Sequence, residues 1–288
     1  MISIIITSYK EPKTIGRAIE SFLKQKIKEK YEVIVVAPDK KTLDKARKYK
    51  VKCLKDKGKG KPSALNLAFE KAKGDIIVLS DGDVYVSNNS VNELIKHFKD
   101  RKIGAVTGRP VALDNKKTLF GYWAHLLNDS AHIERLIRDK KNMPMFCSGY
   151  IFAIRKKLFE KLPEDVLDDA YISMLVLKKG YKIKYEPKAI AYIKNPSNLK
   201  DWIKQKRRNA MGHNHAKRLL RDVPQMKSFF NEVFYGWYKA LSYPKNLKEF
   251  CYTLLLFPAR LYSWLLSFYD KFSKKKVMDV WKRVESTK

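Results

Sequence analysis

The chain has 288 residues, of which 61 are lysine or arginine and 30 are aspartate or glutamate, so its formal net charge is +31. Hydrophobic residues make up 45% of the chain, which excludes a wholly disordered protein. The three cysteines are far apart, which excludes a disulfide framework and a CxxC zinc site and fits a reducing cytosol. The positive charge suits a nucleic acid, an anionic membrane, an anionic small substrate or a lysine-rich solvated surface, and composition does not choose among them.

The first eighty residues alternate between strand and helix patterns. Buried strands are expected at Ser3–Thr7, Glu32–Ala37, Val51–Leu54 and Asp75–Ser80, and helices at Thr14–Lys24, Thr42–Tyr49 and Ser63–Ala72, the last capped by Ser63. Because polar residues follow the apolar N-terminus at once and no basic residues precede it, this segment is interpreted as a strand and not as a signal peptide. The repetition predicts an α/β, Rossmann-like fold with a mostly parallel central sheet, flanking helices and ligands at the carboxyl ends of the strands.

The middle of the chain keeps the mixed pattern. Helices are expected at Val91–Phe98, Leu119–Lys141, Ala170–Lys179 and Leu199–Leu220, and strands at Ile103–Gly108, Gly149–Ile154, Tyr181–Tyr185 and Ala189–Ile193. The last two strands are expected to be separate because Glu186-Pro187 lies between them. Residues 1–220 are therefore expected to form one domain.

Residues 221–288 are expected to form a second, helical region that is aromatic and basic. Aromatic side chains crowd Phe229–Tyr243, and Phe250–Tyr269 contains a single charged residue, Arg260. That length permits a membrane span, but a span would carry the lysines that follow to the far side of the membrane, against the positive-inside tendency. A helix lying in the membrane interface satisfies both the apolar and the basic signals, with a buried core helix and a span as the alternatives.

The triplet Asp81-Gly82-Asp83 directly follows the strand expected at Asp75–Ser80. Two carboxylates one residue apart at the carboxyl end of a strand suit a hard divalent cation that in turn holds a diphosphate. The alternative is an ordinary Asp-Gly turn.

A basic glycine loop, Gly58–Asn66, precedes the third expected helix. Lys61 is a candidate phosphate ligand there, because the helix N-terminus adds a favourable dipole. The spacing excludes a P-loop, since Lys55 stands where the first glycine should be. The alternative is a flexible Lys-Gly loop.

Three further segments complete a set of motifs. Ser3–Glu11 is an apolar strand that ends in a polar loop, Glu164–Asp169 is acidic, and Gln205–Asn209 is a basic stretch of helix. In this order, and with the two motifs above, the set resembles the family 2 glycosyltransferases, which are inverting nucleotide-sugar enzymes with a GT-A fold, including cellulose and hyaluronan synthase-like members. The resemblance covers Ser3 to about Met211.

The resemblance implies a binding site for a UDP-sugar donor. The first loop would hold the uracil and ribose, which makes Thr7, Tyr9 and Glu11 candidate ligands. Asp39 stands one position from the family's acidic pair that contacts the nucleotide and is a further candidate.

The resemblance also assigns the diphosphate partners. Asp81 and Asp83 would hold Mg²⁺ or Mn²⁺ on the donor diphosphate, and Lys61 would contact a phosphate. The metal would neutralise charge on the departing UDP oxygen.

On the acceptor side, the resemblance points to two segments. Ser148 and Gly149 would line the acceptor groove, and Asp169 would be the base that takes a proton from the acceptor hydroxyl, with Asp168 beside it where the family usually has glutamate. The alternative for the two aspartates is a helix N-cap pair.

The segment Gln205–Asn209 resembles the Gln-x-x-Arg-Trp motif of processive and lipid-acceptor members. Gln205 and Arg208 match it, Arg207 is a possible second diphosphate ligand, and Asn209 stands where the tryptophan should be. The missing tryptophan weakens the case for processive synthesis.

Together these observations predict a glycosyltransferase that moves a sugar from a UDP-sugar to a lipid-linked or glycan acceptor at the cytosolic face of the membrane, bound peripherally or monotopically to its anionic surface. One alternative is a family member in solution with a non-lipid acceptor. The other is a basic nucleic-acid-binding protein, which is disfavoured because the basic residues are spread throughout the sequence and the aromatic ones cluster in an apolar segment. No nucleic-acid partner is expected.

Overall fold

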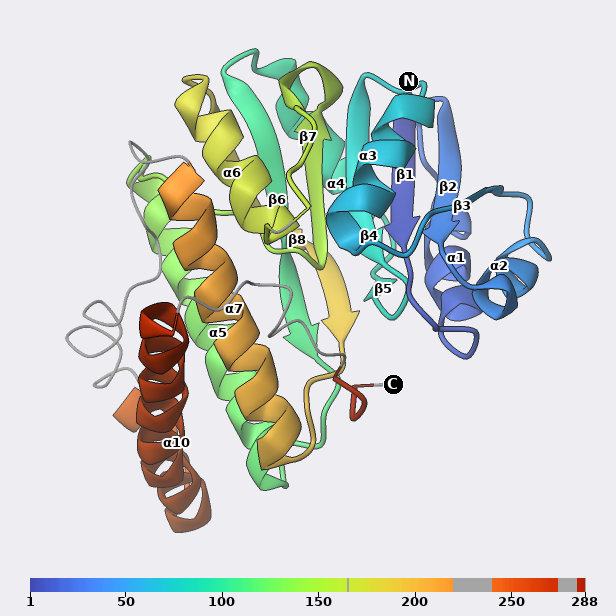
Figure 1. The fold of residues 1–288 in the computed structure, drawn as a ribbon. Helices are drawn as coiled ribbons and strands as arrows, with labels where there is room; N and C mark the ends of the chain where they lie inside the picture. The colour runs from blue at the N-terminus through green and yellow to red at the C-terminus, as the bar shows by residue number, and fades with distance from the viewer. Residues whose placement is uncertain (165, 220–239, 274–283, 288) are drawn as a thin grey trace.

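The computed structural model describes residues 1–164, 166–219, 240–273 and 284–287. Their centre is an eight-stranded sheet with the strand order β3-β2-β1-β4-β7-β6-β8-β5 (Figure 1). The strands are β1 (Ile2–Thr7), β2 (Tyr31–Ala37), β3 (Lys52–Lys55), β4 (Ile76–Asp81), β5 (Tyr85–Val86), β6 (Ile103–Ala112), β7 (Ile151–Arg155) and β8 (Lys182–Ile193).

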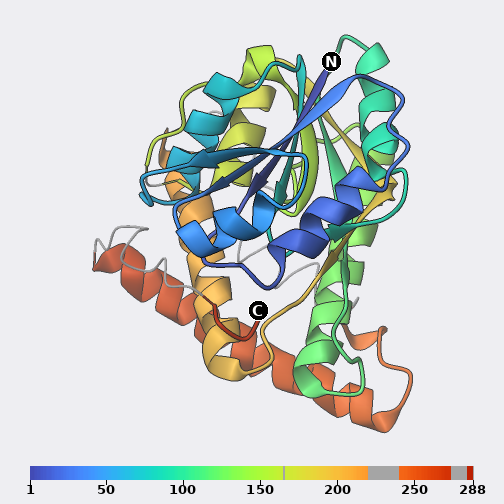
Figure 2. The same cartoon turned by 90° about the vertical axis from the view of Figure 1, so that its right-hand side faces the viewer.

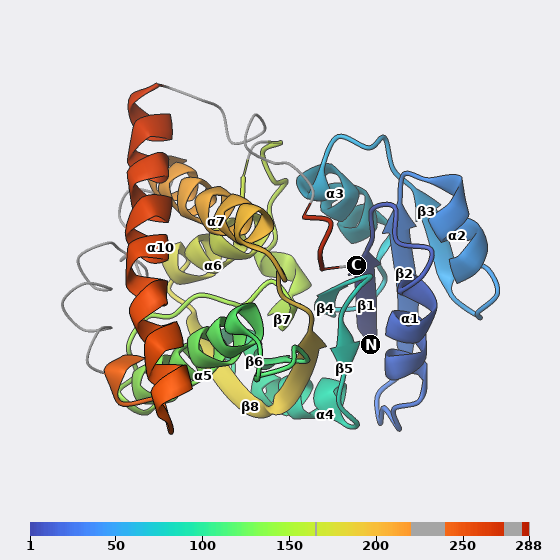
Figure 3. The same cartoon turned by 90° about the horizontal axis from the view of Figure 1, so that it is seen from below.

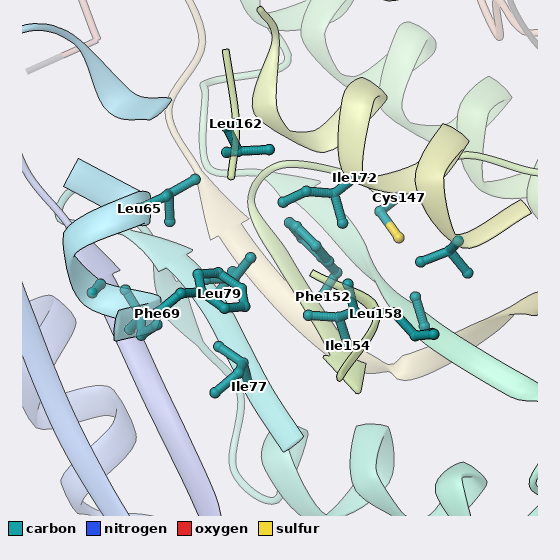
Figure 4. Packing of buried hydrophobic residues seen from close by; sticks show 14 of the residues in the cluster. Leu65, Phe69, Ile77, Leu79, Cys147, Phe152, Ile154, Leu158, Leu162 and Ile172 are labelled. Carbon is teal, nitrogen blue, oxygen red and sulfur yellow. The ribbon is translucent and has the colours of Figure 1, made fainter. Parts of the chain in front are cut away.

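Helices cover both faces of the sheet. They are α1 (Ile15–Leu23), α2 (Lys40–Ala46), α3 (Lys61–Lys71), α4 (Ser90–Ile95), α5 (Leu119–Lys140), α6 (Asp168–Lys178), α7 (Leu199–Leu219) and α10 (Leu247–Phe272), with short 3₁₀ turns at Lys96–Lys99 and Lys156–Leu158. One core lies between the sheet and α3 and α6, where Leu65 and Phe69 pack with Ile77, Phe152 and Ile172 (Figure 4). The second core lies on the opposite face, between the sheet and α1, α2 and α4.

The first half of the sheet has the predicted parallel arrangement. Strands β3, β2, β1 and β4 are parallel, and the register places Thr7 of β1 beside Asp81 of β4. Because parallel strands bring their carboxyl ends to one edge, the loops after β1 and β4 meet there.

The prediction of a mostly parallel sheet is wrong for the second half, so the sheet is mixed. β7 runs antiparallel to both β4 and β6, and β5 runs antiparallel to β8, whereas β6 and β8 are parallel. A strand buried on both faces is apolar in either direction, so the residue pattern of β7 carries no information on its orientation.

Two local predictions also need correction. β8 is one strand that passes through Glu186-Pro187, because the register with β6 is irregular at that point and the missing N–H of Pro187 therefore disturbs no regular ladder. Helix α3 begins at Lys61 and not at Ser63, with Gly60 as its N-cap and Pro62 in its first turn. The earlier start places Lys61 at the helix N-terminus.

The helices α5, α7 and α10 form a further layer beside the sheet, with α10 outermost (Figures 2 and 3). Trp123 of α5 donates from Nε1 to the carbonyl of Tyr252 at 2.7 Å, and Tyr122 shares a 2.7 Å hydrogen bond with Thr253. Arg207 of α7 makes a two-pronged ion pair with Asp270 of α10, whose side chain is 0% exposed. These contacts hold α10 against the helices of residues 1–220.

Helix α10 contains the whole apolar segment Phe250–Tyr269. No helix in the described part of the chain, α10 included, is both long enough and apolar enough to cross a membrane. The outer side of α10 carries exposed apolar residues, so a fully buried core helix does not describe it either. Of the aromatic segment Phe229–Tyr243, all but residues 240–243 lies outside the described residues.

We predict that Asp270→Ala destabilises the protein by about 2–4 kcal/mol, because it leaves the partly buried Arg207 guanidinium without its carboxylate. Urea denaturation measures the change. Asp44→Ala is the matched control, since Asp44 pairs with Arg47 on an exposed surface and its loss should change the free energy of unfolding by less than about 1 kcal/mol. Equal effects of the two substitutions would contradict the role assigned to the buried pair.

Candidate active site

Lys61 lies where the carboxyl edge of the parallel strands meets the start of α6. Its Nζ is 2.7 Å from Asp81 Oδ1 and 3.1 Å from Asp168 Oδ2. Burial alone would lower the pKa of Lys61, but the carboxylates of Asp168 and Asp81 raise it well above its ordinary value. The ammonium therefore stays charged and joins β4 to α6.

Asp81 and Asp83 flank a glycine that the first loop packs against. A Cβ on Gly82 would lie 2.3 Å from Ser8 Oγ and 2.7 Å from Glu11 Oε2, so only glycine permits this approach. Asp81 Oδ1 also accepts a hydrogen bond from Thr7 Oγ1 at 2.9 Å. The predicted triplet is thus held against the first loop, as the neighbouring strands require.

Asp169 occupies the first turn of α6 and is fixed through both carboxylate oxygens. Oδ2 accepts a 3.0 Å hydrogen bond from the backbone N–H of Gly149, and Oδ1 accepts one of 2.8 Å from Ala170. A Cβ on Gly149 would lie 3.1 Å from Oδ2, which is tighter than ordinary packing. The two aspartates open α6 after Leu167, its N-cap, so they belong to the first turn and do not form an N-cap pair.

Asp168 is the most buried carboxylate of the group, with 4% of its surface exposed. Burial raises its pKa to about 6; Lys61 opposes that rise, and the charges of Asp169 and Asp81 add to it. One ammonium shared by several carboxylates compensates each of them only in part, so Asp168 titrates well above an ordinary aspartate.

Ser148 is buried beneath this group and lies beside Gly149. Its backbone N–H donates to Thr107 Oγ1 of β6 at 2.8 Å, and the N–H of the preceding Cys147 donates to Ser173 Oγ of α6. The segment before β7 is therefore fastened to both β6 and α6, which sets the position of Gly149 beside Asp169.

Tyr150 belongs to the segment that the resemblance assigns to the acceptor side, and it lies among the charges of the site. Burial raises the pKa of its phenol to about 12; the charge of Arg208 opposes the rise, while those of Asp83, Asp81 and Asp169 add to it. Arg208 of α7 is thus close enough to act on the same phenol as all three carboxylates. The aromatic residue directly after Ser148-Gly149 was the available sequence signal.

Two of the remaining nucleotide candidates, Glu11 after β1 and Asp39 after β2, accept hydrogen bonds within the protein. Glu11 is buried, and its Oε2 accepts from Ser8 Oγ at 2.7 Å, while Tyr9 is 48% exposed. Asp39 caps α2 by accepting from the N–H of Thr42 and also accepts from the N–H of Lys10 at 2.8 Å. These hydrogen bonds lower the pKa of Asp39 despite its partial burial. Their contact with a nucleotide stays a prediction.

The two arginines of the basic motif on α7 face different parts of the fold. Gln205 is buried, Arg208 acts on Tyr150, and Arg207 is engaged with Asp270 of α10. Successive residues of a helix point about 100° apart, so Arg207 and Arg208 have different partners, and the predicted contact of Arg207 with the diphosphate stays a prediction.

The chemistry of Asp81 and Asp83 fits a divalent cation held together with a substrate. Within the described residues no group of three or more His, Cys, Asp or Glu side chains is arranged to hold a metal ion, so Asp81 and Asp83 are the candidate pair. Mg²⁺ commonly takes one or two carboxylates and completes its shell with phosphate oxygens and water. Both polar contacts that Asp81 makes within the described part of the chain use Oδ1, which leaves Oδ2 to a cation.

Comparison with known proteins identifies relatives of this arrangement. The model of "Glycosyl transferase family 2" matches residues 3–163. The poly-beta-1,6-N-acetyl-D-glucosamine synthase of Staphylococcus aureus is 28% identical over 238 residues, which cover 77% of this chain and 56% of that protein. The probable glycosyltransferase YdaM of Bacillus subtilis is 30% identical over 168 residues, or 55% of this chain and 39% of that protein. The chain thus spans little more than half the length of the synthases that it matches.

Solved structures share the fold. The mannosyltransferase PcManGT from Pyrobaculum calidifontis, solved in complex with GDP-Man and Mn²⁺, aligns with a TM-score of 0.63 at 20% identity, covering 97% of this chain and 82% of its own. S. aureus TarS aligns with a TM-score of 0.51 at 17% identity, covering 86% of this chain and 46% of its own.

We predict that Asp168→Asn changes how stability depends on pH. The folded-state pKa of about 6 lies above the unfolded value of about 3.9, so the contribution of Asp168 to stability is fully present below pH 4 and is lost as the pH rises through 6. The asparagine variant lacks this loss. Its free energy of unfolding relative to wild type should therefore rise by up to about 3 kcal/mol between pH 4 and pH 7.

Urea denaturation at a series of pH values measures this difference. Asp44→Asn, at an exposed position, is the control and should show no such trend. A difference that falls with pH would mean that Lys61 outweighs burial and lowers the pKa of Asp168, which would reverse the expected sign.

Proposed function

The chain belongs to glycosyltransferase family 2, and from this premise we propose that it transfers a sugar with inversion from a UDP-sugar to a lipid-linked acceptor at the cytosolic face of the membrane. It is a glycosyltransferase with a GT-A-like fold, as its motifs led us to expect. The identity of the donor and of the acceptor, the inversion at the sugar and the location at the membrane are what we propose.

One observation carries the catalytic part of the proposal. The ammonium of Lys61 contacts Asp81 of β4 at 2.7 Å and Asp168 of α6 at 3.1 Å, and the charges of Asp83, Asp169 and Arg208 reach the phenol of Tyr150, so groups that are far apart in the sequence come together. A site that transfers a sugar from a diphosphate needs this combination of groups, with carboxylates for a cation and for a proton and basic groups for the phosphates.

Each residue then has a role that its contacts support. Asp169 takes the proton of the attacking acceptor hydroxyl, and the N–H of Gly149 holds its Oδ2 in one orientation. Lys61 has three donors, of which Asp81 and Asp168 use two, so the third is available to the diphosphate. Arg208 contributes a second positive charge. Mg²⁺ or Mn²⁺, held by Asp81 and Asp83, would neutralise charge on the leaving diphosphate.

The choice of UDP rests on the resemblance to the family's motifs. The aligned mannosyltransferase contains GDP-Man, so GDP is the competing nucleotide. Both nucleotides carry the same diphosphate, and the base-binding loop therefore decides between them.

The acceptor and the location are inferred from α10. Its packed face carries polar side chains, with Thr253, Ser263, Ser267 and Asp270 all buried. Its large exposed apolar residues lie on one continuous side of the helix: Leu247, Phe250, Leu254, Leu255, Leu261, Tyr262, Leu265, Tyr269 and Phe272. A helix whose apolar side faces outward, in a chain of net charge +31, fits an anionic membrane surface.

We predict that calorimetry detects UDP binding that requires Mn²⁺ and that Asp83→Asn weakens by roughly 10- to 100-fold, because one of the two cation ligands becomes neutral. Asp169→Asn is the matched control at the same site. It should bind UDP as wild type does and slow UDP release from a UDP-sugar by roughly 10²- to 10⁴-fold, because only the base is lost.

The same titration with GDP identifies the nucleotide. Tighter binding of GDP would replace UDP as the donor nucleotide and leave the metal site intact. Binding that ignores both Mn²⁺ and Asp83 would refute the assignment of the triplet.

We also predict that the protein floats with vesicles of phosphatidylcholine and phosphatidylglycerol, and less with phosphatidylcholine alone. The double variant Leu261→Gln, Leu265→Gln should reduce binding by roughly tenfold or more, because two leucines no longer enter the apolar phase. Leu113→Gln, an exposed leucine outside α10, is the control. A protein that stays with the aqueous fraction in every case would favour the alternative of a non-lipid acceptor.

A further inference from the structure

Helix α5 packs against β6 and β8 and brings three basic side chains together there. They are Arg109 of β6 and His132 and Arg135 of α5, and no motif identified them. Burial lowers the pKa of His132, and the charges of Arg109 and Arg135 lower it further. Burial raises the pKa of the Tyr185 phenol on β8, and the same two charges oppose that rise. The three residues therefore form one cluster.

Arg135 is the deepest member of this cluster, with 5% of its surface exposed. Its Nη1 makes a long 3.4 Å contact with the carbonyl of Ala131, one turn earlier in its own helix, and its Nε has no hydrogen-bond partner in the described part of the chain. Burial lowers the pKa of Arg135, and the charges of Asp169 and Glu134 only oppose this shift. No ion pair joins Arg135 to a described carboxylate. A guanidinium buried in this way is unfavourable unless a ligand supplies the counter-charge.

The other two members of the cluster, Arg109 and His132, also have nitrogen atoms that could donate hydrogen bonds to an anion. Arg109 has a loose 3.6 Å pair with Asp129 and a buried Nε without a hydrogen-bond partner among the described residues, while its side chain keeps 30% exposure. Asp129 is itself shared, because it accepts a 2.7 Å hydrogen bond from Tyr243. His132 uses Nδ1 for a 2.7 Å hydrogen bond with Tyr185, so within residues 1–164, 166–219, 240–273 and 284–287 its Nε2 remains for a ligand.

We propose that Arg109, His132 and Arg135 form a second anion site, next to Asp169, that binds a phosphate group of the acceptor. This inference rests on the proposed function. The donor diphosphate is already provided for by Lys61 and Arg208, so an anion beside the base belongs to the other substrate. Arginine with its fork of donors is the residue best suited to a phosphate.

The position also agrees with the outer helix. A phosphorylated lipid has an anionic head and an apolar tail, and the chain presents an anion site under α5 and an apolar side on α10, which packs on α5. A neutral glycan acceptor would leave Arg135 without a counter-charge. The acceptor class is therefore a lipid that carries a phosphate group as well as the hydroxyl whose proton Asp169 takes.

The test measures the melting temperature of the full chain with decyl phosphate below its micelle concentration, with decanol and with inorganic phosphate. Each is measured with and without UDP and Mn²⁺, which occupy the donor site. Decyl phosphate should raise the melting temperature in both conditions, and decanol and inorganic phosphate should raise it much less.

Arg135→Met is the decisive variant. Without ligand it should melt at or above the wild-type temperature, because it removes an uncompensated buried charge, and it should bind decyl phosphate roughly tenfold or more weakly. Arg135→Lys should restore part of the binding. Lys140→Met, which removes one charge from an exposed position of the same helix, should bind as wild type does.

The outcomes separate this inference from the proposed function. Asp83→Asn should lose UDP binding and keep the decyl phosphate shift, so a failed donor site would be detected independently. The inference is overturned if Arg135→Met keeps the full shift, or if UDP and Mn²⁺ abolish the shift in the wild type. Equal shifts from inorganic and decyl phosphate would overturn the assignment to a lipid acceptor. If Arg135→Met does not fold, Arg109→Gln provides the same comparison at the exposed side of the cluster.

Discussion

The ammonium of Lys61 is the interaction on which the rest of the site depends. It lies between Asp81 at the end of β4 and Asp168 at the start of α6, and without it two partly buried carboxylates would face each other near a third, Asp169. Carboxylates brought this close repel unless a cation lies among them. The same contact joins the parallel half of the sheet to α6. Lys61 therefore both balances the charge of the site and holds two parts of the fold together.

The mixed second half of the sheet supplies what a fully parallel sheet would not. Because β7 runs antiparallel to β4, its N-terminal end, and with it Gly149, lies at the edge where β4 ends. That edge already holds Asp81 and Asp83. The N–H of Gly149 can then orient Asp169, and Tyr150 can lie among the charges of both halves.

The layer formed by α5, α7 and α10 differs from the sheet because it buries polar and charged side chains. Helix α10 buries Thr253, Ser263, Ser267 and the Asp270–Arg207 pair together with Leu256, and it turns its other large apolar side chains outward. Helix α5 buries Arg135 next to the site, against the usual preference of arginine for the surface. Both features fit the proposed acceptor, since a phosphorylated lipid would place its head at Arg135 while α10 lies on the membrane that holds its tail.

The sequence by itself determined the family, the parallel first half of the sheet and most of the residues that the structure brings together in the candidate site. Thr7, Asp81 and Asp169 could be found because each ends or begins an element whose periodicity is clear, and residues at such ends occupy predictable places. The motif order also identified Lys61 and Arg208. Local pattern was enough for these residues because the chemistry and the strand ends coincide.

The tertiary structure decided the direction of β7, the different roles of Arg207 and Arg208, and the place of Arg135. Strand direction depends on where a long crossover returns the chain, and an apolar strand looks the same in either direction. Adjacent arginines on a helix are equivalent in sequence and differ only in which neighbour each one faces. A buried arginine without a counter-charge is a property of its surroundings, and these are contributed by three elements that only folding brings together.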